Sequence, residues 1–163
     1  MTAYTPILAT LAYILSPDKK SVLMIHRNTR PDDLHYGKYN GLGGKISDGE
    51  DIISGLVREI QEESGLTATD IKLRGTISWP GFGKNDEAWF GFIFRVDAYS
   101  GAAHEGNAEG ALEWIELEKI SALNLWESDR LWLDMVFDES PKMFHGIAPF
   151  KDGKLVSWNF QRI

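Results

Sequence analysis

Runs of hydrophobic residues separated by short polar turns dominate the start of the chain. Residues 7–15 and 21–26 are mostly apolar, and the Ser-Pro-Asp sequence between them supplies turn residues. Short apolar runs bounded by turn signals are typical of buried strands, so this segment predicts a β-hairpin. Residues 28–38 are polar and contain a proline and a glycine, which predicts a loop. Residues 39–46 then predict a short strand that contains glycines.

Residues 52–64 change to the period of an α-helix. One arc of this helix carries the apolar side chains that we expect to face the core: Ile52, Ile53, Leu56, Val57 and Ile60. Asp51 suits the N-cap because its carboxylate accepts hydrogen bonds from the first helical N–H groups. Gly65 suits the position just after the helix, where a left-handed conformation is favoured.

The rest of the chain predicts further strands, a second helix and a closing hairpin. Residues 118–138 have apolar positions at roughly helical spacing, and residues 144–163 predict a hairpin that turns at residues 151–153. The additional strands are expected at residues 71–81, 87–101 and 112–117. The order β-β-β-α-β-β-β-α-β-β predicts an α/β fold in which a mixed sheet packs against helices. A length of 163 residues without repeat or linker indicates one domain, residues 1–163.

Composition and charge exclude several classes of protein. The absence of cysteine excludes disulfides, zinc–thiolate sites and thiol catalysis. The net charge is −7 and no Lys/Arg-rich block is present, so we expect no binding to DNA or RNA polymers. The N-terminal apolar run lacks a basic segment before it and is too short to span a bilayer. We therefore predict a cytoplasmic protein that does not associate with membranes.

Three glutamates crowd the last turns of the first predicted helix: Glu59, Glu62 and Glu63. Like charges three and four residues apart on a helix destabilise it by about 0.2–0.5 kcal/mol per pair. Helical geometry places these carboxylates in an arc about 100° wide at the edge of the apolar face. Either they form a solvated acidic surface, or their oxygens converge on a hard cation such as Mg²⁺. Arg58 precedes Glu62 by four residues, so it either pairs with that glutamate or orients a carboxylate.

Residues 44–66 match the spacing G-x5-E-x7-R-E-U-x-E-E-x-G-U, with U aliphatic, at every fixed position. The matching residues are Gly44, Glu50, Arg58, Glu59, Ile60, Glu62, Glu63, Gly65 and Leu66. This motif is the Nudix box, and the chain resembles the Nudix hydrolases. The resemblance implies the Nudix fold, an α/β/α sandwich in which this loop–helix–loop binds divalent metal. It also implies hydrolysis of a nucleoside diphosphate linked to another group.

The resemblance also implies roles for the residues of the box. Glu59, Glu62 and Glu63 are expected to bind Mg²⁺, with Mn²⁺ as an alternative ion and the carbonyl oxygen of Gly43 as an additional ligand. Arg58 is expected to orient the carboxylates. This assignment agrees with the physical chemistry, because a divalent ion neutralises phosphate charge and lowers the pKa of a bound water.

Two residues outside the box are expected to act near the phosphates. Glu109 matches a late acidic residue that reaches the metals in related enzymes, so Glu62, Glu63 or Glu109 is the expected general base. Arg27 resembles a phosphate-contacting arginine of MutT-type enzymes, and a guanidinium group suits phosphate oxygens. The alternatives are an ordinary loop glutamate and an ordinary surface arginine.

Residues 26–45 and 124–146 resemble segments of the bacterial MutT-type 8-oxo-dGTP diphosphatases and of the mammalian oxidised-purine nucleoside triphosphatases. On this resemblance, Asn40 is expected to read the purine edge, since an amide donates and accepts hydrogen bonds at once. Trp126 is expected to stack on the base, and Asp129 to contact it. The alternatives are a turn asparagine, a core tryptophan and a surface aspartate.

The sequence departs from that pattern at one position. The mammalian enzymes have two adjacent acidic residues at the purine, whereas this chain has Ser128 before Asp129. The sequence therefore defines the reaction more closely than it defines which base is preferred. The aromatic residues at 79–82 and 89–90 either form a wall of the base pocket or pack in the core, and the pattern favours the core. The four histidines have no metal-ligand spacing, and the sequence assigns them no role.

The sequence as a whole predicts a Mg²⁺-dependent Nudix pyrophosphohydrolase. The expected substrate is a small nucleotide, an oxidised purine nucleoside triphosphate such as 8-oxo-dGTP, cleaved to the monophosphate and pyrophosphate. A diadenosine polyphosphate or ADP-ribose is the alternative substrate, and a non-catalytic nucleotide-binding regulator is the alternative function. The protein is expected to be a monomer or a homodimer.

Overall fold

Twelve strands and two α-helices make up the computed structural model, which describes residues 1–163. The strands are β1 (Ile7–Leu15), β2 (Ser21–His26), β3 (Tyr39–Asn40), β4 (Leu42–Lys45), β5 (Thr67–Trp79), β6 (Trp89–Ser100), β7 (Gly106–Asn107), β8 (Gly110–Glu116), β9 (Phe144–Ile147), β10 (Phe150–Lys151), β11 (Lys154–Leu155) and β12 (Asn159–Arg162). The helices are α1 (Ile52–Ser64) and α2 (Asp129–Phe137), with two short 3₁₀ helices, η1 (Lys84–Asp86) and η2 (Leu117–Ala122). No helix is long and apolar enough to cross a membrane.

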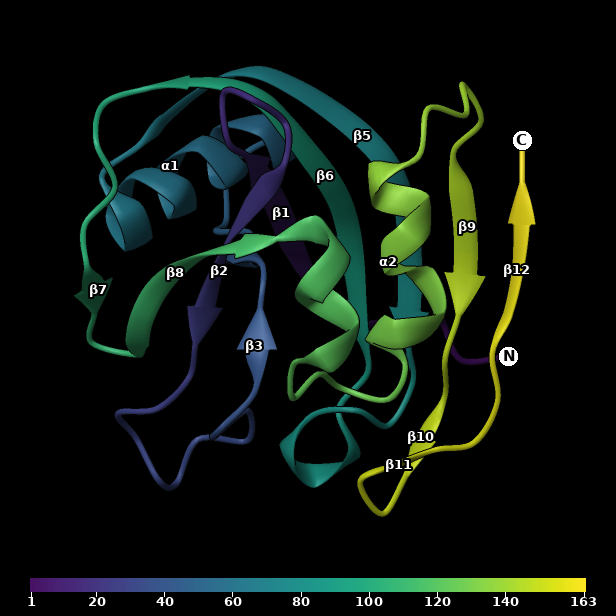
Figure 1. Ribbon diagram of the computed structural model, residues 1–163. Coiled ribbons are helices and arrows are strands. Elements are labelled where there is room, and N and C mark those ends of the chain that lie inside the picture. The colour runs from purple at the N-terminus through teal and green to yellow at the C-terminus, as the bar shows by residue number, and fades with distance from the viewer.

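The sheet is mixed, as the order of predicted elements required. Its strands follow the order β12-β9-β5-β6-β1-β2-β8-β7, with β3 beside β2 and β4 beside β1 (Figure 1). The β1–β6 and β5–β9 pairs are parallel, and the other pairs are antiparallel. Strands β10 and β11 form a separate ribbon at the closing turn.

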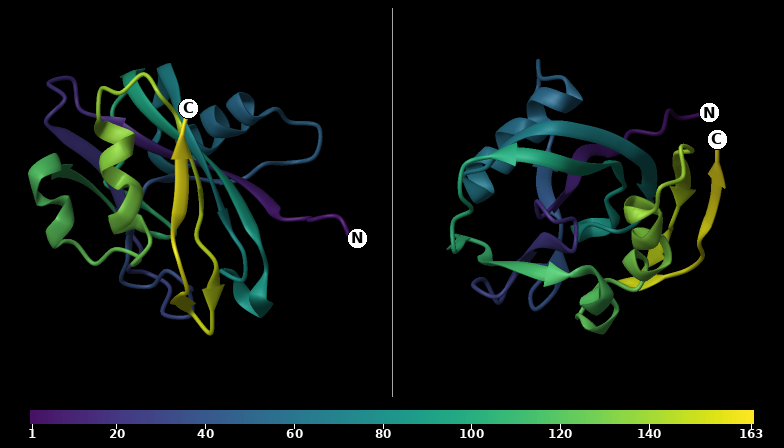
Figure 2. Two further views of the ribbon diagram at one scale, coloured as in Figure 1. Left: turned by 90° about the vertical axis from the view of Figure 1, so that its right-hand side faces the viewer. Right: turned by 45° about the horizontal axis from the view of Figure 1, so that its top comes forward.

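Alternation along the central strands gives the sheet two apolar faces. Tyr13 of β1 and Met24 of β2 join the core cluster that contains the buried side of α2. Ile14 and Leu23 point to the other face and join the cluster that contains the buried side of α1. Because successive side chains of a strand point in opposite directions, one sheet can bury both helices. Figure 2 shows α1 and α2 on opposite sides of the strands, so the predicted α/β/α sandwich is confirmed.

A fork in the sheet replaces the single strand predicted at residues 39–46. Strand β3 pairs with β2, with Asn40 opposite Ile25. After Gly41 the chain crosses to β1, where β4 pairs along the first half of that strand and β2 pairs along its end. The sheet is therefore split between β1 and β2.

The predicted limits of the first helix are confirmed by its caps. The Asp51 carboxylate accepts hydrogen bonds from the backbone N–H groups of Ile53 and Ser54 at 2.9 and 3.0 Å. Gly65 ends the helix in the left-handed conformation, with φ of 77°. The expected apolar face is correct except at Ile53, which is 43% exposed because it lies in the first turn at the edge of the arc.

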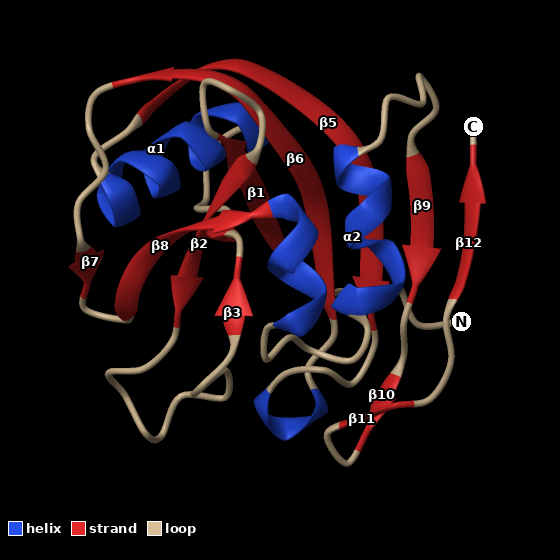
Figure 3. Ribbon diagram, viewed as in Figure 1, coloured by secondary structure: helices blue, strands red, loops and turns tan.

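The predicted second helix at residues 118–138 is wrong in its extent. The structure has two shorter helices there, η2 and α2, with a non-helical segment between them (Figure 3). Asn124 in this segment bonds to β3 and to the loop before it. Asn124 accepts a hydrogen bond from Tyr39 through its carbonyl oxygen at 3.0 Å, and its side-chain amide donates to Gly37 at 2.9 Å. These tertiary contacts interrupt the helix that the periodicity favours.

The remaining strands are close to prediction. Strand β5 begins at Thr67, earlier than expected, and the two-residue β7 was not predicted. The closing hairpin is confirmed, since β9 and β12 are antiparallel and the chain turns at Asp152 and Gly153 with positive φ.

Two buried arginines from the sheet hold the C-terminal end of α2. Arg74 of β5 donates to the carboxylate of Asp138 at 2.8 Å and to the carbonyl oxygen of Met135 at 3.3 Å. Arg95 of β6 donates to the carbonyl oxygen of Asp138 at 3.0 Å. Arg162 of β12 completes the ion pair with Asp138 at 2.7 Å. Cations at this end of a helix satisfy its free carbonyl groups and its dipole.

We expect the Asp138→Asn substitution to lower the free energy of unfolding by about 1–2 kcal/mol, because it removes the charge that pairs with Arg74 and Arg162. Urea denaturation measures this change. Glu139→Gln is the matched control, since that carboxylate is 92% exposed and 3.9 Å from Arg95. Equal losses in the two variants would contradict this account of the α2 terminus.

Candidate active site

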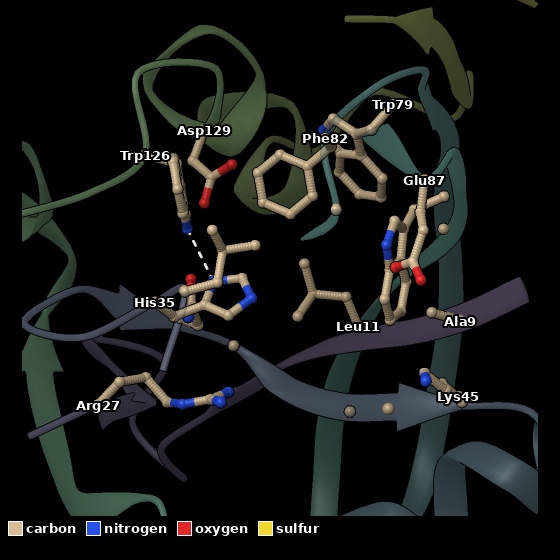
Figure 4. Close-up of a pocket in the computed structure, with 18 of the residues that line it drawn as sticks. Ala9, Leu11, Arg27, His35, Lys45, Trp79, Phe82, Glu87, Trp126 and Asp129 are labelled. Carbon is tan, nitrogen blue, oxygen red and sulfur yellow. Dashed lines mark hydrogen bonds between the residues drawn. The ribbon is translucent and has the colours of Figure 1, made fainter. Parts of the chain in front are cut away.

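A cavity of about 570 Å³ opens beside the fork in the sheet. Its walls come from the start of β1, the loop after β2, the turn between β5 and β6, and the segment that leads into α2 (Figure 4). All six residues predicted for the site outside α1 line it, namely Arg27, Asn40, Gly43, Glu109, Trp126 and Asp129. The fold therefore brings together positions that lie far apart in the sequence.

The glutamates of α1 lie against the glycines at the edge of this cavity. Strand β4 approaches β1 so closely that a Cβ atom on Gly43 would collide with the carbonyl oxygen of Thr10. A Cβ atom on Gly44 would lie 2.7 Å from the carboxyl carbon of Glu59. The backbone N–H of Gly43 donates to the carboxylate of Glu63 at 3.1 Å. Glycine is required at both positions, because a side chain at Gly43 would collide with the backbone of β1 and one at Gly44 would displace the Glu59 carboxylate.

Arg58 forms the centre of a cluster of carboxylates on α1. Its Nε and Nη2 atoms donate to the two oxygens of Glu50 at 2.7 and 3.0 Å. Its Nη1 atom donates to Glu59 at 2.8 Å and to Glu62 at 3.3 Å. Hydrogen bonds from Arg58 lower the pKa of Glu50 to about 2, and the pKa of Arg58 is raised in turn. Arg58 therefore pairs with Glu62 and also bonds to Glu50 and Glu59, while its role in orienting carboxylates for a metal stays a prediction.

Glu63 is the most perturbed carboxylate of the helix. Burial raises its pKa to about 8, with further contributions from the charges of Glu109 and Glu59 and an opposing one from the Gly43 N–H. A carboxylate forced toward its neutral form by neighbouring carboxylates is the environment that a divalent cation relieves. The donor set of carboxylate and carbonyl oxygens fits Mg²⁺. No three acidic or histidine side chains enclose one point in this structure, because Arg58 draws Glu59 and Glu62 to itself.

Arg27 and Glu109 form a pair on the wall of the cavity. Arg27 donates to Asp33 at 2.7 Å and to Glu109 at 3.2 Å, and its side chain is 18% exposed. Asn107 holds Glu109 in place, since its side chain accepts from the Glu109 N–H at 2.8 Å and donates to the backbone of Glu63 at 2.9 Å. No pattern in the sequence indicated Asp33 or Asn107, because their contacts form only in the folded chain.

Asp129 is buried at the first residue of α2 and is not a surface aspartate. Its side chain lines the cavity, and the residue is only 7% exposed. Burial raises its pKa to about 7, although the hydroxyl of Ser128 donates to it at 3.3 Å and favours the charged form. A carboxyl group with such a pKa can donate or accept a hydrogen bond near neutral pH. Asn40 also lines the cavity, and its side-chain amide makes no hydrogen bond within the chain.

Aromatic side chains form a large part of the cavity wall. The Trp126 ring contacts Phe82 edge-to-face at 5.0 Å, and Trp79 and Trp89 also line the cavity. The core-packing interpretation of this aromatic group was therefore incomplete. His35 also lines the cavity, which no spacing in the sequence indicated.

The comparisons with known proteins agree with the fold and the motif. The family model described as the NUDIX domain matches residues 5–136, and the chain belongs to the NUDIX family. It is 32% identical over 148 residues to the oxidized purine nucleoside triphosphate hydrolase of Danio rerio, covering 91% of this chain and 89% of that protein. The Mus musculus protein of the same name is 32% identical over 145 residues, covering 89% and 87% respectively.

A solved structure confirms the Nudix fold. The MutT protein from Bacillus halodurans superimposes with a TM-score of 0.81 at 24% identity, covering 94% of this chain and 97% of that chain.

We expect the Arg58→Met substitution to destabilise the protein mainly above pH 5 in buffer that contains a chelator. The folded pKa of Glu50, about 2, lies below that of an unfolded glutamate, so its contribution is present above the unfolded pKa and is lost as pH falls toward 2. The gap in unfolding midpoint between wild type and variant should narrow as pH falls. Exposed Arg30, changed to Met, is the control. A gap that is constant with pH would contradict the assignment.

We expect the Asp129→Asn substitution to have the opposite pH dependence. The folded pKa of Asp129, about 7, lies above that of an unfolded aspartate, so the folded state binds more protons and the wild type loses stability as pH rises toward 7. The unfolding midpoint of the variant should therefore gain on that of the wild type as pH rises from about 4 to 7. Thermal unfolding measures this trend, with Asp134→Asn on the exposed side of α2 as control. A gain that does not grow with pH would argue against a buried carboxylate.

Proposed function

We propose that the protein is a Mg²⁺-dependent Nudix pyrophosphohydrolase that cleaves an oxidised purine nucleoside triphosphate, such as 8-oxo-dGTP, to the monophosphate and pyrophosphate. The observation that carries the proposal is the juxtaposition of the complete box on α1 with a cavity whose far end offers an aromatic ring, an amide and a buried carboxyl group. The names of the vertebrate relatives support the same substrate class.

In this proposal the carboxylates of α1 hold the metal. Glu59, Glu62, Glu63 and the carbonyl oxygen of Gly43 are the ligands of Mg²⁺, for which Mn²⁺ can substitute. The ion supplies charge neutralisation for the phosphates and a bound water of lowered pKa. Arg58, which is hydrogen-bonded to Glu59 and Glu62, would share these two carboxylates with the ion.

The chain itself provides the proton acceptor and a phosphate contact. Glu62, Glu63 or Glu109 accepts the proton of the attacking water, and Glu109 has the advantage of lining the cavity. Arg27 exchanges part of its pairing with Asp33 and Glu109 for phosphate oxygens. A guanidinium group already fixed by two carboxylates loses little conformational entropy when it binds phosphate.

The purine binds at the other end of the cavity. Trp126 stacks on the base, and the free amide of Asn40 donates to and accepts from its edge. Asp129 adds a second polar contact, and because its pKa lies near 7 it can match either a donor or an acceptor on the base. Ser128 replaces an acidic group with a hydroxyl, which reduces charge at this end. We further propose a cytoplasmic monomer or homodimer that does not bind nucleic-acid polymers, in keeping with its net charge of −7.

The proposal is tested by turnover of a nucleotide panel with Mg²⁺ and identification of the products. We expect 8-oxo-dGTP to be hydrolysed faster than dGTP, a diadenosine polyphosphate and ADP-ribose, with pyrophosphate as a product. Equal rates on 8-oxo-dGTP and dGTP would remove the preference for the oxidised base. No turnover of any nucleotide would indicate a non-catalytic nucleotide-binding module.

The Glu62→Gln variant serves as the catalytic control for this panel. Turnover should fall at least about 100-fold, because the amide is a poor metal ligand. The fold should be retained, since the side chain is 60% exposed. Glu118→Gln, at an exposed glutamate of η2 outside the cavity, should have wild-type turnover. Near-normal turnover of Glu62→Gln would contradict the metal assignment.

A further inference from the structure

A histidine in the loop after β2 is hydrogen-bonded to the indole of Trp126. The Nε1–H group of Trp126 donates to Nδ1 of His35 at 2.8 Å (Figure 4). The two rings are nearly perpendicular, with an interplanar angle of 87° and centroids 5.6 Å apart. Nδ1 can accept this bond only when it carries no proton, so the neutral His35 ring has its proton on Nε2.

The other contacts of the Trp126 ring do not define its orientation as narrowly. Phe82 and Phe150 contact it edge-to-face at 5.0 and 6.2 Å, and Nζ of Lys38 lies 5.2 Å from its centroid. Dispersion and cation–π contacts depend weakly on rotation of the ring within its plane. A hydrogen bond is directional, and the indole has a single N–H group, so this bond selects one orientation.

His35 is itself fixed by the surrounding loop. Its backbone N–H donates to Oδ1 of Asp33 at 3.1 Å, and Oδ2 of Asp33 accepts from Nε of Arg27 at 2.7 Å. Burial lowers the pKa of His35 to about 4, and the nearby charge of Arg27 lowers it further, against the charge of Asp33. The side chain is therefore neutral at neutral pH, and the Asp33 carboxylate holds the backbone that carries it. Such a residue can transmit a defined orientation to its partner.

We propose that His35 is a positioning residue, whose Nδ1 atom fixes the Trp126 ring in the orientation that receives the purine. The inference rests on the proposed function, because it assumes that Trp126 stacks on the base. A ring that is oriented before the substrate arrives need not be ordered on binding, which favours affinity. The carboxylates of α1 have no contact with this pair, so the chemical step is not expected to depend on it.

The first test detects the hydrogen bond between Trp126 and His35 in the protein without substrate. The ¹H–¹⁵N spectrum should contain six indole signals, one for each tryptophan, and the Trp126 signal is assigned by its absence in Trp126→Phe. His35→Phe keeps an aromatic ring but removes the acceptor, so the Trp126 signal should move upfield. His35→Asn places an amide oxygen near the position of Nδ1 and should restore the signal. A Trp126 signal that is unchanged in His35→Phe would overturn the proposal.

The second test separates binding from chemistry. His35→Phe should raise KM about three- to tenfold, the value of one hydrogen bond, while kcat is unchanged. His35→Asn should restore KM. In the Trp126→Phe background, which lacks the donor, His35→Phe should have no additional effect. A loss of kcat with unchanged KM, or an equal effect in both backgrounds, would overturn the proposal.

The two proposals fail in different ways. If no nucleotide is turned over by the wild type, the proposed function fails, but the indole signal still decides whether His35 orients Trp126. If the wild type hydrolyses the nucleotides and His35→Phe changes neither the signal nor KM, only the positioning role fails.

Discussion

The guanidinium group of Arg58 is the charge on which the arrangement of the α1 carboxylates depends. Glu50, Glu59 and Glu62 are all hydrogen-bonded to it, and Glu50 in turn accepts from the N–H of Ser47 in the loop before the helix. Without this cation the three carboxylates would repel one another, and the loop would lose its attachment to the helix. Lysine cannot take over this role, because its ammonium group lacks the planar set of five donors. The same contacts that stabilise the helix therefore hold its acidic groups at the edge of the cavity.

The glycines of β4 impose the second constraint, since they allow a strand to lie between β1 and the carboxylates of α1. Close approach leaves Glu63 half-buried, and the fork leaves a cavity whose other end buries Asp129. Both carboxyl groups have pKa values raised toward neutral, which means that their charged forms are less stable in the folded protein than in water. A protein optimised for stability alone would not bury them. The charged forms of Glu63 and Asp129 are therefore destabilised at the two ends of the site. A cation beside Glu63 and a hydrogen-bonding ligand beside Asp129 would stabilise them.

The box could be placed from the sequence because a single local element determines it. Helical spacing alone puts Glu59, Glu62 and Glu63 on one arc, and Asp51 and Gly65 mark its limits through their own chemistry. The segment between η2 and α2 could not be predicted in the same way. Its periodicity is helical, yet Asn124 bonds to Gly37 and Tyr39, and such long-range contacts leave no periodic signal. The burial of Asp129 could not be predicted from the sequence for a related reason. A charged residue is ordinarily exposed, and only the packing of α2 against the sheet encloses this one.

The two parts of the site differ in how many segments of the chain form them. The end proposed to bind metal comes from one continuous segment, whereas the end proposed to bind the base is assembled from the loop after β2, the turn between β5 and β6, and the start of α2. Substitutions in any of those three segments can change the proposed base pocket without moving the α1 carboxylates. The two ends are nevertheless joined by a continuous set of contacts that runs from Glu109 through Arg27 and Asp33 to His35 and Trp126. Arg27, the phosphate contact of the proposed function, is bonded to Asp33, and Asp33 supports the backbone of His35. The residues proposed to bind the phosphates and to stack on the base are therefore linked through this loop.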